Sequence, residues 1–364
     1  MAKRLPAKVK FAVVGVGHIG GRHAFLIRNN PDAELVALID TRPGFVEEAA
    51  VAYPGVPAFS SLKTFLAAGV PADVLCVCTP NYLHYPHTIK GLKQGYHVVC
   101  EKPMALDTLH AAEMLAVAEE KQRHIFCVMQ NRYSPPAVWL KEVVESGVLG
   151  QLYMVQVNCF WNRDERYYSG TNWRGCGKQD GGTLFTQFSH FVDMLYWLFG
   201  DITNIKGQFR DFNHQQLTDF EDSGFIQFEF VKGGLCSFNY TTAVPRQNLE
   251  SSITLVAENG SIKVGGQYMN KVEYCNILNY EVPELQPCQP ANNYGAYTGS
   301  AANHQFVIEN VISTLRNETT ATTNAHDGLK VVEMIERIYS LKKKEATGVE
   351  AKAAKERVLS DDGE

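Results

Sequence analysis

Two side chains in this 364-residue sequence stand where they could take a proton from a hydroxyl group. Lys102 lies in the tripeptide Glu-Lys-Pro directly after an apolar run, and the following proline disfavours helical backbone at the lysine. Its amine is therefore expected at the tip of a strand, while His190 lies in QFSHFVDMLYWLFG, a predicted helix. A lysine with a pKa of about 10.4 is a poor base at neutral pH unless burial or a positive charge lowers that pKa. Taken alone, Lys102 is more typical of a solvated loop, and His190 of a helix core.

A glycine-rich motif follows the first predicted strand and opens a helix. It reads G-V-G-H-I-G, with Gly15, Gly17 and Gly20 enclosing His18 and Ile19. In this context the glycines allow a tight turn, close approach of a pyrophosphate and close helix–strand packing, while the helix N-terminus binds phosphate. Asp40 ends the second predicted strand, where a carboxylate binds the adenosine ribose and repels a 2′-phosphate. We therefore expect NAD as the cofactor, with NADP as the alternative if Arg42 pairs with that phosphate.

The elements that position these residues alternate in type over residues 1–131. Apolar runs such as KFAVVGV, LVALID, VLCVCTP, HVVCEKP and HIFCVMQ alternate with helix-length amphipathic stretches. This pattern predicts an α/β fold with a parallel sheet covered on both faces, an N-terminal Rossmann domain. We expect the cofactor-binding side chains at the carboxyl edge of this sheet. They are Thr79, Asn81 and His84 after the third clear strand, and Glu101 and Lys102 after the fourth.

Residues 132–345 have a different pattern, which predicts an α+β domain with a large open antiparallel sheet. Alternating runs flank a Lys-Gly-Gly turn at 232–234 and the Asn259-Gly260 pair. At Asn259-Gly260 we expect a hairpin whose two central residues both have positive φ. The helical stretches HQFVIENVISTLRN and DGLKVVEMIERIYSLKKK close the domain, and we expect the last one to pack back on the first domain. Residues 346–364 are predicted to be a frayed tail.

Composition excludes several functional classes. The formal net charge of −5 offers no basic field for nucleic acid, and no stretch approaches the roughly 20 apolar residues that cross a membrane. The nine cysteines are an odd number, and several lie in apolar runs, which favours a reducing cytoplasm over a disulfide framework. No zinc-type Cys/His spacing, nucleophile elbow or Walker loop is present, so we expect no metal centre.

Together these motifs resemble the Gfo/Idh/MocA family of NAD(P)-dependent sugar and polyol oxidoreductases. The resemblance rests on GVGHIG, on CTPN with His84, on EKP, and on DGGTL leading to His190 and Asp193, and it runs from about residue 9 to about residue 340. It implies that Lys102 and His190 assist deprotonation of a hydroxyl while a hydride leaves the same carbon for the nicotinamide. It also implies a homodimer or homotetramer formed through the sheets of the second domain.

One position departs from the usual pattern of the family. Many members have an aspartate four residues before the matching histidine, whereas this sequence has Thr186 followed by Gln187. Because threonine cannot act as a carboxylate, simple polyols become less favoured substrates. The change resembles the branch that oxidises C3 of UDP-N-acetylglucosaminuronic acid (UDP-N-acetyl-2-amino-2-deoxy-D-glucuronate) in surface-polysaccharide pathways. That branch has asparagine-glutamine at these two positions, and the asparagine is absent here.

The segment 162–184, NRDERYYSGTNWRGCGKQDGGTL, looks like the substrate segment of the same branch. Its guanidinium groups suit a diphosphate and a carboxylate, and its rings suit stacking on uracil or a sugar. The candidate substrate-binding residues are Arg163, Arg166, Tyr167, Trp173, Arg174, Thr186, Gln187 and His190. The alternative interpretation is a solvated loop with ordinary ion pairs and packing aromatics. A second segment, 292–306, resembles a substrate loop and adds Tyr294, Tyr297 and His304 as weaker candidates.

The sequence thus predicts a cytoplasmic NAD-dependent dehydrogenase that oxidises a secondary hydroxyl of a sugar nucleotide, with C3 of UDP-N-acetylglucosaminuronate as the leading candidate. A dehydrogenase of a free sugar, inositol or another polyol is the first alternative, and the basic segment argues against it. A non-catalytic NAD-binding sensor is the second. The presence of both Lys102 and His190 argues against a sensor, because a binding module has no use for two proton acceptors.

Overall fold

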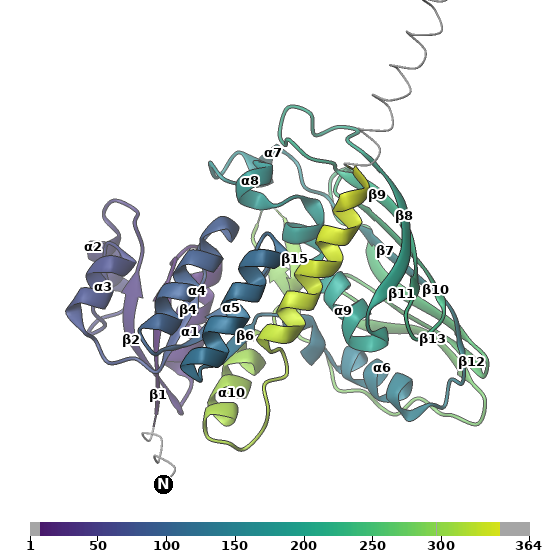
Figure 1. The fold of residues 1–364 in the computed structure, drawn as a ribbon, viewed down its shortest axis with the longest axis horizontal. Helices are drawn as coiled ribbons and strands as arrows, with labels where there is room; N and C mark the ends of the chain where they lie inside the picture. The colour runs from purple at the N-terminus through teal and green to yellow at the C-terminus, as the bar shows by residue number, and fades with distance from the viewer. Residues whose placement is uncertain (1–7, 296, 343–364) are drawn as a thin grey trace, which may run out of the picture.

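The computed structural model describes residues 8–295 and 297–342, and the predicted tail at 346–364 lies outside them. Two sheets stand side by side, the N-terminal one at the left of Figure 1 and the larger one at the right. The α/β fold, with a Rossmann domain followed by a domain built on a large open sheet, is confirmed. In the described part of the chain no helix has the length and apolar character needed to cross a membrane.

The first sheet is parallel and has the strand order β3-β2-β1-β4-β5-β6. Its strands are β1 (Val9–Val14), β2 (Ala33–Ile39), β3 (Ala58–Phe59), β4 (Val74–Val77), β5 (His97–Cys100) and β6 (Ile125–Cys127). The helices around it are α1 (His18–Asn29), α2 (Phe45–Ala52), α3 (Leu62–Ala68), α4 (His84–Lys93) and α5 (Thr108–Lys121). All four residues of β4 are buried, as expected for a strand that helices cover on both faces. The two-residue strand β3 was too short for the sequence pattern to predict.

The second sheet has the order β13-β12-β11-β7-β10-β9-β8. Its strands are β7 (Leu152–Phe160), β8 (Ile202–Arg210), β9 (Ser223–Phe230), β10 (Leu235–Thr241), β11 (Glu250–Ala257), β12 (Gly260–Gly265) and β13 (Lys271–Ile277). The helices α6 (Pro135–Ser146) and α9 (Ser189–Phe199) share a hydrophobic core with one face of this sheet (Figure 1). Every pairing is antiparallel except that of β7 with β10. After β7 the chain forms the edge strand β8, and antiparallel pairings join β8 to β9 and β9 to β10. Strand β10 therefore lies beside β7 and runs parallel to it.

The predicted hairpin around Asn259 is present, but the expected turn geometry was wrong. Gly260 already pairs with Ala257 as the first residue of β12, so the turn consists of Glu258 and Asn259. Neither Asn259 nor Gly260 has a positive φ. A Cβ on Gly260 would lie 2.6 Å from the carbonyl oxygen of Asn276, so the glycine permits the close approach of β13.

Two C-terminal helices return to the junction between the domains. Helix α10 (His304–Leu315) packs against α1 and joins the hydrophobic cluster of the Rossmann sheet. The helical residues 325–342, yellow in Figure 1, cross the junction. Glu336 accepts a hydrogen bond from Thr108 at the start of α5, and Arg337 pairs with Asp201 just before β8 at 2.7 Å. The last described helix therefore contacts both domains.

A buried ion pair anchors α9 at the same junction. Arg132 lies in the short helical turn η2 (Gln130–Tyr133), and its Nε lies 2.9 Å from Oδ2 of Asp193 in α9. The guanidinium also bonds Asp327 at 2.7 Å. Both Arg132 and Asp193 are at least 98% buried, and with the two carboxylates the arginine charge is fully paired. Helix α9, which carries His190, is thus tied to the chain that leaves the Rossmann sheet.

Candidate active site

The glycine motif forms a tight junction between β1 and α1. Gly15 has φ of 86°, and a Cβ on Gly20 would lie only 1.9 Å from the carbonyl oxygen of Gly15. Gly17 caps α1 without a side-chain hydrogen bond, and a Cβ there would meet nothing within 4 Å. The exposed His18 and the partly buried Ile19 occupy the first turn. The free N–H groups of this turn and the open space beside Gly17 fit a pyrophosphate.

Asp40 lies at the end of β2 and faces the glycine loop. Its Oδ2 accepts a hydrogen bond from the backbone N–H of Val16 at 2.7 Å, and its Oδ1 accepts one from the N–H of Arg42 at 2.9 Å. The Arg42 Nε also lies 3.3 Å from Oδ1. Because the Arg42 guanidinium is paired with this carboxylate, the end of β2 fits a ribose hydroxyl better than a phosphate.

The loops after β4 and β5 meet at the carboxyl edge of the sheet, as predicted. His84 joins them, with its Nδ1 2.6 Å from the carbonyl oxygen of Pro103 and its Nε2 2.8 Å from that of Thr79. The imidazole is 1% exposed, and burial lowers its pKa. His84 was predicted to bind the cofactor, and the structure places it beneath the two loops, where it holds them together.

Glu101 is buried between two histidines that come from distant parts of the chain. Its Oε1 lies 2.8 Å from Nε2 of His23 in α1 and 3.7 Å from Nε2 of His304 in α10. Burial is the largest single influence and would raise the pKa of Glu101, but the His23 hydrogen bond and the charges of His23, His304 and Lys102 together lower that pKa to about 2. Glu101 is therefore an anion at neutral pH.

Lys102 extends from the end of β5 toward the second domain. Its ammonium donates a hydrogen bond to the carbonyl oxygen of Thr186. Burial, assisted by the charges of Arg163 and Arg174, lowers the pKa of Lys102 to about 8, while Glu101 opposes the change. The free amine is thus accessible near neutral pH, which suits a proton acceptor.

His190 lies close to this amine in the first turn of α9. The imidazole is 2% exposed, and burial first and the charge of Lys102 second hold its pKa well below the usual range. Its Nε2 lies 3.3 Å from the Gln130 amide, and its Nδ1 has no hydrogen-bond partner in the described structure. His190 is a neutral imidazole with one nitrogen free for a ligand.

A π-helical turn, η3 (Leu184–Phe188), precedes α9 and brings two predicted substrate residues into the site. Such turns are frequent at functional sites. The Thr186 hydroxyl accepts a hydrogen bond from the Asn81 amide at 2.9 Å and donates one to the carboxylate of Asp180. Asn81, predicted to bind the cofactor, thereby links the Rossmann domain to the second domain. Gln187 accepts a hydrogen bond from Arg163 at 2.7 Å.

Arg163 is a buried cation whose hydrogen-bond acceptors in the described part of the chain are all neutral. Its side chain bonds the carbonyls of Asn162 at 2.6 Å and Thr298 at 3.2 Å, as well as the side-chain oxygens of Gln187 and Asn248. The residue is 2% exposed, and burial lowers its pKa. No carboxylate in residues 8–295 or 297–342 pairs with it. An uncompensated buried charge is costly, so this geometry suits an anionic ligand.

Arg174 lies beside Arg163 and is also without a carboxylate partner in the described part of the chain. Its guanidinium carbon lies 4.3 Å from the ring centre of Tyr167 and 5.6 Å from that of Trp173. It donates to the Tyr167 carbonyl at 3.2 Å and to the Tyr297 hydroxyl at 3.5 Å, while its Nε is buried without a partner. Arg174 therefore retains hydrogen-bonding capacity for a ligand.

Arg166, predicted beside these arginines, lies on the opposite side of a short helix. Helix α7 (Glu165–Tyr168) buries Tyr167 and turns Arg166 outward, where it pairs with Asp164 at 2.6 Å and is 54% exposed. The alternative interpretation of this segment, a solvated loop with ordinary ion pairs, therefore holds for Arg166. Arg163 and Arg174, in contrast, point inward.

The hairpin of β14 (Ala291–Asn293) and β15 (Thr298–Ala301) reaches across to both parts of the site. The ring of Tyr294 lies 5.9 Å from His18 in the glycine motif and stacks on Tyr297 at 4.9 Å. The Tyr297 ring in turn lies 5.0 Å from the Arg163 guanidinium. These aromatics connect the cofactor loop with the arginine pair.

Sequence reasoning missed Asp180 and His23 as site residues. Asp180 ends α8 (Gly177–Asp180) and is 1% exposed, but it is not among the site residues predicted from the sequence. Its position in the DGGTL motif, six residues before Thr186, is the signal that could have identified it. His23 carries no such signal, because its contact with Glu101 spans 78 residues.

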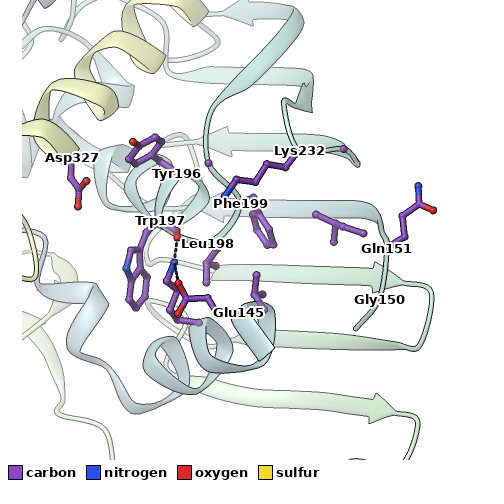
Figure 2. Close-up of a pocket in the computed structure, with 14 residues that line it drawn as sticks. Glu145, Gly150, Gln151, Tyr196, Trp197, Leu198, Phe199, Lys232 and Asp327 are labelled. Carbon is purple, nitrogen blue, oxygen red and sulfur yellow. Dashed lines mark hydrogen bonds and ion pairs between the residues drawn. The ribbon is translucent and has the colours of Figure 1, made fainter. Parts of the chain in front are cut away.

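A cavity of about 570 Å³ lies elsewhere, between α6, the end of α9 and the β9–β10 turn (Figure 2). Its charges are largely paired within the chain: Lys141 bonds Glu145 at 2.9 Å and the Trp197 carbonyl at 2.5 Å. None of the residues that carry the proton chemistry line it. We place the active site by its chemistry, at the domain junction.

The model of the oxidoreductase family with an NAD-binding Rossmann fold matches residues 9–129, and that of its C-terminal alpha/beta domain matches residues 141–350. The chain belongs to the Gfo/Idh/MocA oxidoreductase family. Residues 9–129 accordingly form the NAD-binding Rossmann domain of this family. The cofactor is NAD.

Two solved structures resemble this chain over most of its length, and a curated enzyme resembles it over a shorter stretch. The WlbA dehydrogenase from Bordetella pertussis, solved with NADH and UDP-GlcNAcA, is 33% identical and has a TM-score of 0.80, over 92% of this chain and 96% of that one. The WlbA enzyme from Chromobacterium violaceum, solved with the same molecules, is 31% identical, with a TM-score of 0.80 over 93% and 94%. The D-glucoside 3-dehydrogenase of Escherichia coli is 28% identical over 62% of this chain and 68% of its own length.

Proposed function

We propose that this protein oxidises a secondary hydroxyl of an anionic sugar nucleotide, with C3 of UDP-N-acetylglucosaminuronate as the substrate position, in surface-polysaccharide synthesis. The observation that carries the proposal is the pair Arg163 and Arg174. Both guanidinium groups lie near the lysine, and neither pairs with a carboxylate of the described chain. A sugar nucleotide with a diphosphate and a carboxylate supplies the missing negative charge. The likeness to two enzymes solved with UDP-GlcNAcA supports the same substrate class.

The proposed chemistry divides between the cofactor and two side chains. NAD, when bound at the glycine loop, accepts a hydride from the substrate carbon. Lys102, as the free amine, takes the proton of the same hydroxyl, and the unpaired Nδ1 of His190 gives a second hydrogen bond to that group. The Arg163 and Arg174 pair holds the anionic part of the substrate. The rings of Tyr297 and Tyr167, which lie against the two guanidinium groups, exclude water from these charges.

The test is reduction of NAD by the purified protein, followed by nicotinamide absorbance. UDP-N-acetylglucosaminuronate is compared with UDP-N-acetylglucosamine, which lacks the carboxylate, and with myo-inositol, which lacks both anionic groups. We expect turnover with the uronate and little with the other two. Turnover with myo-inositol alone would favour the polyol alternative. NAD binding without reduction of any substrate in a broad sugar panel would favour the sensor.

We also propose that the outer face of the second sheet joins two copies of the chain. Leu235 and Met154 are neighbours across β10 and β7, and Val256 lies beside Met154 on β11. Their side chains are 56%, 57% and 40% exposed, and Phe225 on β9 is 56% exposed. An open apolar sheet face of this kind is typical of an interface. Light scattering should give a mass of at least twice the 40.6 kDa of one chain, and a purely monomeric mass would contradict the proposal.

A further inference from the structure

A buried carboxylate next to the lysine has no role in the chemistry proposed above. The carboxylate of Asp180 accepts two hydrogen bonds. The Thr186 hydroxyl donates to its Oδ1, and the backbone N–H of Gly175 donates to its Oδ2 at 2.8 Å. The carbonyl of the same Thr186 receives the ammonium of Lys102. We propose that Asp180 is a positioning residue: through the Thr186 hydroxyl it fixes the carbonyl on which Lys102 rests, and it sets a negative charge beside the amine. The inference rests on the proposed function of Lys102 as the proton acceptor.

The hydrogen bonds around Thr186 have a defined direction. The Asn81 amide donates to the Thr186 hydroxyl at 2.9 Å and to the Asp180 carbonyl oxygen at 2.8 Å. Since the hydroxyl accepts from Asn81, its single proton is donated to Asp180, whose carboxylate Oδ1 and backbone carbonyl oxygen both lie within hydrogen-bond distance. The chain of bonds therefore runs from the loop after β4, through the π-helical turn, to the end of α8. It holds the two sides of the domain junction around the lysine.

The charge of Asp180 acts on the lysine as well as on its support. Burial raises the pKa of Asp180 to about 6, while the hydrogen bonds from Thr186 and Gly175 oppose this change. The carboxylate is ionised above pH of about 6, and it then favours the protonated form of Lys102. The charged and titratable groups that face Lys102 are Glu101, Asp180, Arg163, Arg174, His84, His190 and His304.

Removal of the Asp180 charge should therefore make the lysine a stronger acid. Competitive acylation with acetic anhydride, followed by mass spectrometry of the Lys102 peptide, measures the fraction of free amine against pH. In D180N the midpoint should move to lower pH by about one unit. The matched control is E165Q, which removes an exposed carboxylate from the same segment and should leave the midpoint unchanged. An unchanged or higher midpoint in D180N would overturn the inference.

A second pair of variants tests the link through Thr186 without removing the carboxylate. T186V lacks the hydroxyl, so Asp180 loses a hydrogen-bond donor and its pKa should rise. Because Asp180 is then neutral to a higher pH, the midpoint of the Lys102 titration should move to lower pH, as in D180N. T186S restores the hydroxyl and should restore the wild-type midpoint. A wild-type midpoint for Lys102 in T186V would show that the Thr186 hydroxyl does not affect the lysine, and would contradict the inference. If D180N does not fold, the comparison of T186V with T186S is the test.

These measurements need no substrate, so they separate the inference from the proposed function. If the wild type does not reduce NAD with the uronate but the Lys102 midpoint is shifted in D180N, the proposed function is contradicted and the positioning role of Asp180 is supported. If wild type turns over the uronate, T186V should lose kcat with little change in KM. Turnover by the wild type with no shift in either variant would reject only the inference.

Discussion

Replacing Lys102 with alanine should lower kcat by about 10²–10⁴-fold, the usual contribution of a positioned proton acceptor. The variant should still bind NAD, because the glycine loop and Asp40 lie on other strands. The measurement is NAD reduction with saturating UDP-N-acetylglucosaminuronate, with NAD affinity followed by fluorescence. The matched control is Lys63→Ala, at an exposed lysine of α3.

The pH profile of the wild type provides a second readout of the same group. The pKa of Lys102 is lowered to about 8 by burial, and only the neutral amine accepts a proton. Oxidation should therefore increase as pH rises through about 8, and this limb should be absent in Lys102→Ala. Undiminished turnover in the variant would reject the lysine as the base and leave the histidine as the remaining candidate.

Arg174→Met should raise KM for the uronate by about 10–100-fold, because a hydrogen bond to a charged group contributes about 1.5–3 kcal/mol. The binding contact is made equally in the ground and transition states, so kcat should change little. Methionine keeps an unbranched side chain at this position while it removes the guanidinium, which lies 4.3 Å from the ring centre of Tyr167.

Arg166→Met is the matched control for this substitution. It removes a guanidinium from the same segment, but one that is exposed and already paired with Asp164. Its KM should equal that of the wild type. Equal effects of the two substitutions would mean that the segment attracts the substrate only by its net charge, and no effect of Arg174→Met would remove the arginine pair as the support for an anionic substrate.

The arrangement of the glycine loop and Asp40 could be predicted from the sequence, whereas the contacts of Asn81 and His84 could not. Gly15, Gly17, Gly20 and Asp40 lie within one strand–helix–strand unit, so local chain geometry decides their arrangement. The alternating apolar runs likewise predicted the parallel sheet, because only buried strands require them. The position of Lys102 at the end of β5 follows from the same local rules.

The substrate side depended on contacts between distant segments. Residue type and spacing could not distinguish Arg163 and Arg174, which point inward, from Arg166, which a single turn of α7 directs to solvent. The π-helical turn at Leu184–Phe188 was not predictable, yet it determines that the Thr186 hydroxyl meets Asp180.

The sequence by itself determined the fold class and the NAD cofactor through short-range patterns, whereas Lys102 and His190 became candidates for proton transfer only through the resemblance to the family. The tertiary structure decided how Lys102 and His190 are charged and which arginines have no carboxylate partner among the described residues. Burial at the junction lowers the pKa of Lys102, and only the approach of α10 and of the β14–β15 hairpin brings His304 and Tyr297 to the site. Desolvation and long-range pairing arise when the two domains pack together, so no local pattern encodes them.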